Sequence, residues 1–143
     1  MNVAQIIQSR TSADIISIPR DASVAEAVRL LANRRIGALP VMEGGSVAGI
    51  FSERDVIYRL AEEGDACLSR EVGDVMTSPA ITVDRSTSID QALALMTKRR
   101  IRHLPVVDGE TMCGFISIGD LVKSRFDAVE YEAQALREYI RMA

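Results

Sequence analysis

The chain has 143 residues, a mass of 15.6 kDa and a formal net charge of −3. Its length fits one domain or a compact pair of repeats, and its 48% hydrophobic and 26% charged residues exclude gross disorder. The acidic balance disfavours nucleic-acid binding, no apolar run is long enough to cross a membrane, and the single histidine predicts no zinc site. We expect a cytoplasmic protein with reduced thiols, because we see no secretory signal and Cys67 and Cys113 are isolated.

An internal repeat organises the sequence. With a shift of about 65 residues, residues 18–57 align with residues 83–122 without a gap, and roughly fourteen of forty positions are identical. The identical positions include Leu39-Pro40-Val41, which aligns with Leu104-Pro105-Val106. The repeat therefore predicts two structurally equivalent units.

Each copy predicts the same elements in the same order. A short β-rich segment, at 15–18 or 80–83, precedes a helix that opens with a capping box at Ser23 or Ser88. A hairpin follows in each copy, and its strands are expected at 38–42 and 47–51, and at 103–107 and 112–117. A second helix is then expected near Glu53 or Ile118, and residues 65–77 are the predicted connector.

The order β-α-β-β-α, repeated, predicts an α+β fold. A single unit of about 60 residues buries little surface, so we expect the two repeats to pack sheet to sheet around one core with pseudo-twofold symmetry. The predicted divisions are repeat 1 at 1–68, repeat 2 at 69–126 and a C-terminal helix extension at 127–143.

Each repeat carries the motif Gly-h-h-Ser-x-x-Asp, where h is hydrophobic, at a strand-to-helix junction. The two copies run from Gly49 to Asp55 and from Gly114 to Asp120. Ser-x-x-Asp is a good helix cap, and free N–H groups at a helix start also accept phosphate. The local sequence leaves both interpretations open.

Two further features distinguish the halves of the chain. Repeat 2 has Arg102-His103 where repeat 1 has Gly37-Ala38, which indicates either solvated surface charge or phosphate recognition. A heptad-like apolar seam extends past repeat 2, and it predicts either a helix folded over its own domain or a helix paired with a second copy. The seam residues are Val122, Phe126, Val129, Ala133, Leu136 and Ile140.

The doubled repeat, with Leu-Pro-Val before each turn and Gly-h-h-Ser-x-x-Asp after it, resembles a tandem pair of cystathionine-β-synthase (CBS) domains, called a Bateman module. The resemblance covers about residues 1–125 and is closest to short stand-alone bacterial members. It implies a regulatory module that binds adenosine-containing ligands such as AMP, ADP, ATP or NAD(H) between the repeats, and it implies dimers.

The resemblance also implies roles for individual residues. Asp55 and Asp120 would hold ribose, and Ser52 and Ser117 would contact phosphate or ribose. Residues implied to frame the adenine through backbone groups are Ile16, Ser17, Ile81 and Thr82, and those implied to form apolar walls are Ile36, Pro40, Ile101 and Pro105. Arg102 and His103 would face phosphates, with Arg54 as a substitute cation in repeat 1. We therefore expect the Asp120 site to prefer the more highly phosphorylated ligand.

We expect no catalytic residues, no metal and no obligatory cofactor. The expected partners are a small adenosine ligand, a second copy through helices that include the C-terminal one, and an unidentified target protein, but neither membrane nor nucleic acid. The alternatives are a structural dimerisation module with empty clefts and, with little support because the chain has no Walker loop, a nucleotide hydrolase that uses His103.

Overall fold

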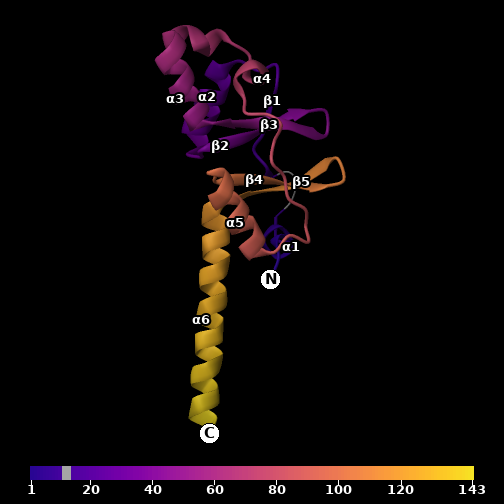
Figure 1. Ribbon diagram of the computed structural model, residues 1–143, viewed down its shortest axis with the longest axis vertical. Helices are drawn as coiled ribbons and strands as arrows, with labels where there is room; N and C mark the ends of the chain where they lie inside the picture. The colour runs from indigo at the N-terminus through magenta and orange to yellow at the C-terminus, as the bar shows by residue number, and fades with distance from the viewer. Residues whose placement is uncertain (11–13) are drawn as a thin grey trace.

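The computed structural model describes residues 1–10 and 14–143, which form two stacked units and a long projecting helix (Figure 1). The elements are α1 (Val3–Ile7), β1 (Ile18–Pro19), α2 (Val24–Arg34), β2 (Ala38–Glu43), β3 (Ser46–Ser52), α3 (Glu53–Glu63), η2 (Gly64–Ser69), α4 (Val72–Val75), α5 (Ile89–Arg99), β4 (His103–Asp108), β5 (Thr111–Ser117) and α6 (Ile118–Met142). Strands β1, β2 and β3 form one sheet, and β4 and β5 form another. The expected α+β fold is confirmed.

Helix starts follow the predicted caps. The Ser88 hydroxyl accepts the Gln91 N–H at 3.0 Å, and the Gln91 side chain accepts the Ser88 N–H at 3.0 Å. Ser23 accepts the Glu26 N–H at 3.1 Å, but the described contacts of Ser23 include no return bond, so its predicted capping box is half formed. These bonds satisfy N–H groups that the first helical turn leaves free.

The two hairpins form in equivalent registers. Leu39 lies opposite Phe51 in the first unit, and Leu104 lies opposite Ile116 in the second. The expected β-rich segments pair only at their ends. Ile18 pairs with β2 in parallel, and Val83 forms a single parallel bridge to β4. The hairpins therefore carry most of the sheet structure.

The described core residues form two clusters, one in each unit, and not the single shared core expected from the sequence. The units also exchange short helices. Val3 and Ile7 of α1 are buried in the core of the second unit, whereas Val72 and Val75 of α4 are buried in the core of the first. Backbone bonds anchor both exchanges, since the Val3 N–H donates to the Thr87 carbonyl at 2.9 Å and the Val72 N–H donates to the Ala22 carbonyl at 2.8 Å.

The glycine that opens each Gly-h-h-Ser-x-x-Asp motif makes room for the exchanged segment. A Cβ on Gly114 would lie 2.8 Å from Cγ2 of Ile7, and a Cβ on Gly49 would lie 2.7 Å from the Thr77 carbonyl oxygen. Real Cβ atoms do not approach so closely. These two glycines are thus packing residues, a role that the local motif does not reveal.

Helix α6 leaves the second unit and projects away from it as a single rod whose end carries the C-terminus (Figure 1). Leu121 is its buried residue, and most of its seam side chains are exposed. Among residues 1–10 and 14–143, no helix is both long enough and apolar enough to span a membrane.

Candidate functional site

Two clefts lie where the two units meet. Strands β3 and β5 are in contact, and each leads directly into a helix, α3 or α6, whose first turn contains the motif aspartate. In each unit the first N–H of this helix donates to the residue just before the same unit's hairpin, from Glu53 to the Gly37 carbonyl at 3.0 Å and from Ile118 to the Arg102 carbonyl at 2.8 Å. The duplicated sequence therefore places two equivalent acids at the junction of the units.

The first cleft contains Asp55 and has a volume of about 380 Å³. That volume is within the usual range for small-molecule sites. Oδ2 of Asp55 accepts the Ser52 N–H at 2.8 Å and the Ser52 hydroxyl at 3.1 Å, and Oδ1 accepts the Thr77 hydroxyl at 3.0 Å. The described ion pairs do not include Asp55, so its carboxylate interacts with neutral donors only.

Four arginines also line the first cleft: Arg54, Arg99, Arg100 and Arg102. Arg54 of the first unit donates from Nη1 to the Arg100 carbonyl of the second unit at 3.2 Å. Arg100 itself ends α5 in the left-handed conformation, with φ of 55°. The cleft thus combines the Asp55 carboxylate, which is bound to neutral donors, with exposed guanidinium groups from both units, and Glu53, the ion-pair partner of Arg102, lines it as well.

The second cleft contains Asp120 and has a volume of about 210 Å³. Here the carboxylate is paired with a cation. Arg10 donates from Nη2 to Oδ1 of Asp120 at 2.8 Å and from Nη1 to Oδ2 at 3.3 Å, and Nη1 also lies 3.4 Å from the Phe115 carbonyl oxygen. The Ser117 N–H donates to Oδ2 at 2.9 Å.

Electrostatics keep Asp120 ionised. Partial burial tends to raise the pKa of Asp120, but the hydrogen bonds from Arg10 and Ser117, together with the positive charge of Arg10, outweigh that effect and hold the pKa below its usual value. The second cleft therefore holds a carboxylate that is already satisfied by a guanidinium group.

His103 lines both clefts. Its ring stacks on Phe115 with the ring centroids 5.5 Å apart. Burial, followed by the charge of Arg102, lowers the pKa of His103 below 6.5, although Asp120 and Glu53 act in the opposite direction. His103 is thus a mainly neutral imidazole at neutral pH, placed between the two clefts.

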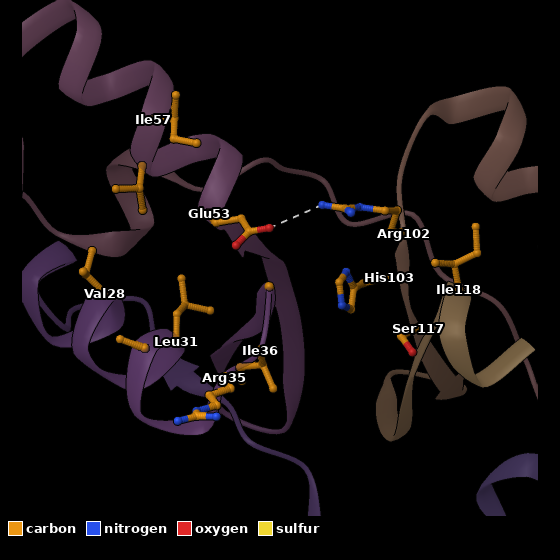
Figure 2. Close-up of a pocket in the computed structure, with 13 residues that line it drawn as sticks. Val28, Leu31, Arg35, Ile36, Glu53, Ile57, Arg102, His103, Ser117 and Ile118 are labelled. Atoms are coloured by element: carbon orange, nitrogen blue, oxygen red, sulfur yellow. Dashed lines mark hydrogen bonds and ion pairs between the residues drawn. The ribbon is translucent and has the colours of Figure 1, made fainter. Parts of the chain in front are cut away.

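A third and larger cavity, of about 640 Å³, is an interhelical groove beside the clefts. Apolar side chains of α2 and α3, including Leu31 and Ile57, line one side, while Arg102 and Ile118 of the second unit line the other (Figure 2). Figure 2 shows Glu53 and Arg102 reaching toward each other across the gap, with Oε1 and Nη2 3.4 Å apart. This ion pair is exposed and joins the two units.

Most of the sequence-predicted site residues line the two clefts. Those that line the first are Ser52, Arg54, Asp55, Ile81, Ile101, Arg102 and His103, and those that line the second are Ile16, Ile36, His103, Ser117 and Asp120. Four others lie outside the lining of both cavities. Pro40 and Pro105 are buried within the hairpins, and Ser17 and Thr82 are exposed.

Arg102 lines the opposite cleft from the one expected from the sequence, whereas Arg54 lines the Asp55 cleft as expected. Arg102 was expected to face phosphates at the Asp120 site, but it lines the Asp55 cleft. The hairpin of each repeat contributes to the cleft of the other repeat's acid, because the two sheets meet at β3 and β5. The expectation that the Asp120 site prefers the more phosphorylated ligand therefore loses its basis.

The family model of the CBS domain matches this chain at residues 3–62 and 72–127. The chain belongs to the CBS domain family. A mitochondrial CBS domain-containing protein of Arabidopsis thaliana, CBSX3, is 38% identical over 126 residues, which cover 85% of this chain and 61% of that protein. This chain thus spans less than two thirds of the length of that curated relative.

Solved structures of CBS-domain proteins share the fold. The CBS-domain protein ATU1752 from Agrobacterium tumefaciens is 35% identical with a TM-score of 0.80, and the match covers 87% of this chain and 92% of that one. The CBS domain pair of protein MJ0100 is 25% identical with a TM-score of 0.73, over 86% of this chain and 98% of that one. That structure is a complex with 5′-methylthioadenosine and S-adenosyl-L-methionine.

Sequence reasoning missed several residues of the clefts. Thr77 binds Asp55 from the connector, and Arg10 binds Asp120 from the segment after α1. Arg99 and Arg100, at the end of α5, line the first cleft, although no role there was expected of them from the sequence. No local pattern marks Thr77 or Arg10, because each reaches its partner through the exchange of segments between the units.

Proposed function

We propose that this CBS pair is a regulatory module that binds an adenosine-containing nucleotide, such as AMP, ADP, ATP or NAD(H), and transmits occupancy to a partner protein. The observation that carries the proposal is the first cleft, where the Asp55 carboxylate shares one cavity with four arginines. A nucleotide offers both complements, since its ribose hydroxyls donate to a carboxylate and its phosphates accept from guanidinium groups. The adenosine ligands of MJ0100 support the choice of nucleoside.

Each chemical part of the nucleotide has a counterpart in the first cleft. Asp55 would accept hydrogen bonds from the ribose hydroxyls, in place of its bond from Thr77. Ile81 and Ile101 offer apolar surface for the base. Arg100 and Arg102 would bind phosphate, and the bidentate geometry of arginine suits phosphate oxygens.

Transmission would use the contacts that join the two units. Phosphate competes with Glu53 for Arg102, so binding would exchange an exposed contact between the units for a contact to the ligand. A ligand shifts such an equilibrium only by its differential affinity for the two arrangements. The proposed response is therefore a change in the relative position of the units.

Isothermal titration calorimetry with AMP tests this proposal, with GMP as the control nucleotide. We expect Asp55→Asn to weaken AMP binding at one class of site by more than tenfold, because two charge-assisted hydrogen bonds to ribose are lost. Asparagine still caps helices well. The matched control is Asp108→Asn at the exposed end of β4, which should leave affinity unchanged. Unchanged affinity in Asp55→Asn would refute the assignment.

We also propose that the module is a homodimer through α3 and α6. Phe126, Val129, Leu136 and Ile140 are each more than half exposed on α6, and Ile57 is 61% exposed on α3. A stripe of this kind along a helix of about 37 Å is typical of a surface that packs against another helix. Its seven-residue spacing favours a second copy of the same helix.

Sedimentation equilibrium tests the dimer. Leu136→Ser is expected to weaken self-association, whereas Gln134→Ser, on the same helix but outside the seam, should leave it intact. A monomeric wild-type chain would refute the dimer without affecting the ligand proposal. A dimer that shows no thermal shift with any adenine nucleotide would favour a purely structural role.

We propose no catalytic role. Turnover of ATP that is abolished by His103→Ala would contradict this proposal. The proposed location is the cytoplasm, because the unpaired thiols of Cys67 and Cys113 suit a reducing compartment.

A further inference from the structure

The second cleft differs from the first in the groups that bind its aspartate. Both oxygens of Asp120 receive hydrogen bonds from the Arg10 guanidinium, at 2.8 and 3.3 Å, whereas the oxygens of Asp55 receive theirs from hydroxyl and backbone groups. A ligand that uses Asp120 for its ribose must therefore displace a cation, while a ligand that uses Asp55 displaces a neutral hydroxyl. The duplicated motif hides this difference, because Arg10 lies outside residues 18–57, the part of repeat 1 that aligns with repeat 2.

Arg10 follows α1, whose Val3 and Ile7 side chains are buried in the core of the second unit. Its N–H donates to the Ile7 carbonyl at 3.0 Å, and Ile7 is 4% exposed in the core of the second unit. The guanidinium group itself is more open, since 39% of the Arg10 side chain is exposed. The Arg10 backbone is thus tied to the second core, while part of its side chain remains exposed in the cleft.

We propose that Arg10 sets the ligand specificity of the second cleft by exchanging Asp120 for a phosphate of the ligand. This inference rests on the proposed function. A ligand whose ribose takes Asp120 leaves the guanidinium without its carboxylate, and a phosphate on the same ligand restores a bidentate partner. An uncharged nucleoside restores none. The second cleft therefore selects phosphorylated adenosine ligands, although its lining includes neither Arg100 nor Arg102.

The test compares AMP with adenosine by calorimetry in the full chain that carries Asp55→Asn, which confines ribose binding to the second cleft. With Arg10 present, we expect AMP to bind at least tenfold more tightly than adenosine. Arg10→Gln keeps a hydrogen-bond donor but removes the charge. It should bring the affinities for AMP and adenosine to within about threefold of each other. The main change should be tighter binding of adenosine, which no longer has to displace a cation from Asp120. Arg10→Lys should restore part of the preference, since it keeps the charge but not the bidentate geometry.

The matched control is Arg141→Gln near the exposed end of α6, which removes the same charge far from the clefts and should leave the preference unchanged. If the ratio of the AMP affinity to the adenosine affinity is the same in the Asp55→Asn chain with and without Arg10→Gln, the inference is wrong while the proposed function stands. If neither compound binds the Asp55→Asn chain but AMP binds the wild type, the second cleft takes no nucleotide and the inference is also wrong. If no adenosine compound binds the wild type, both proposals fail.

Discussion

The exchange of α1 into the second unit makes a quantitative prediction for Ile7→Ala. Ile7 is 4% exposed and packs with Ile116 and Leu121 in the second core, so its truncation leaves a cavity that costs about 2–5 kcal/mol. The unfolding entropy of a 143-residue chain is about 0.3 kcal/mol/K at 2.1 cal/mol/K per residue. A loss of about 3 kcal/mol should therefore lower Tm by about 10 °C.

Differential scanning calorimetry and urea denaturation measure this effect at a fixed protein concentration. The control is Gln8→Ala at the exposed end of the same helix, which should change stability by less than about 0.5 kcal/mol. If Ile7→Ala does not fold, Ile7→Val removes one methylene group and should cost about 0.5–1.5 kcal/mol. An unfolding free energy within 0.5 kcal/mol of wild type for Ile7→Ala would refute the packing of α1 on the second unit.

A double-mutant cycle with Gly114→Ala tests the same contact from the other side. The added Cβ would lie 2.8 Å from Ile7 Cγ2, so the single variant should lose about 1–3 kcal/mol. Combined with Ile7→Ala, the new methyl group meets space in place of a side chain, so the two losses should be less than additive. Strict additivity would show that the two residues do not touch.

Three further predictions concern the clefts and the hairpins. Lowering the pH through 6.5 should reduce the free energy of unfolding, because burial and the charge of Arg102 hold the pKa of His103 below 6.5 and the unfolded chain then binds the proton more tightly. An NMR titration of this single histidine should give a midpoint below 6.5. Glu53→Gln should tighten AMP binding about threefold by calorimetry, because the ion pair that competes with phosphate is lost. Gly49→Ala should cost about 1–3 kcal/mol in urea denaturation, since its Cβ would lie 2.7 Å from a backbone carbonyl oxygen, whereas Gly45→Ala meets open space and should change stability by less than about 0.5 kcal/mol.

A histidine midpoint above 6.5 would mean that the carboxylates around the imidazole outweigh its burial. Unchanged or weaker AMP binding in Glu53→Gln would mean that the ion pair between Glu53 and Arg102 does not compete with the ligand. Equal stability of the two glycine variants would mean that the connector does not approach β3 as closely as described.

Several elements of the fold could be predicted from the sequence because local interactions specify them. The Ser88 cap joins residues three positions apart, and the hairpin turns depend on Gly44 and Gly109 with φ of 65° and 64°. The two aspartates of the repeated motif could be placed at helix starts for the same reason. Local bonds of this kind repeat whenever the sequence repeats.

The tertiary structure alone decided which unit buries α1, which cleft contains Arg102 and what each aspartate binds. Arg10 and Asp120 are 110 positions apart, and Arg54 reaches the Arg100 carbonyl across 46. Such contacts depend on how the two similar units pack against each other, and the periodicity of the sequence carries no information about that packing. The repeat therefore determined two equivalent acids, while the exchange of segments between the units made their surroundings different.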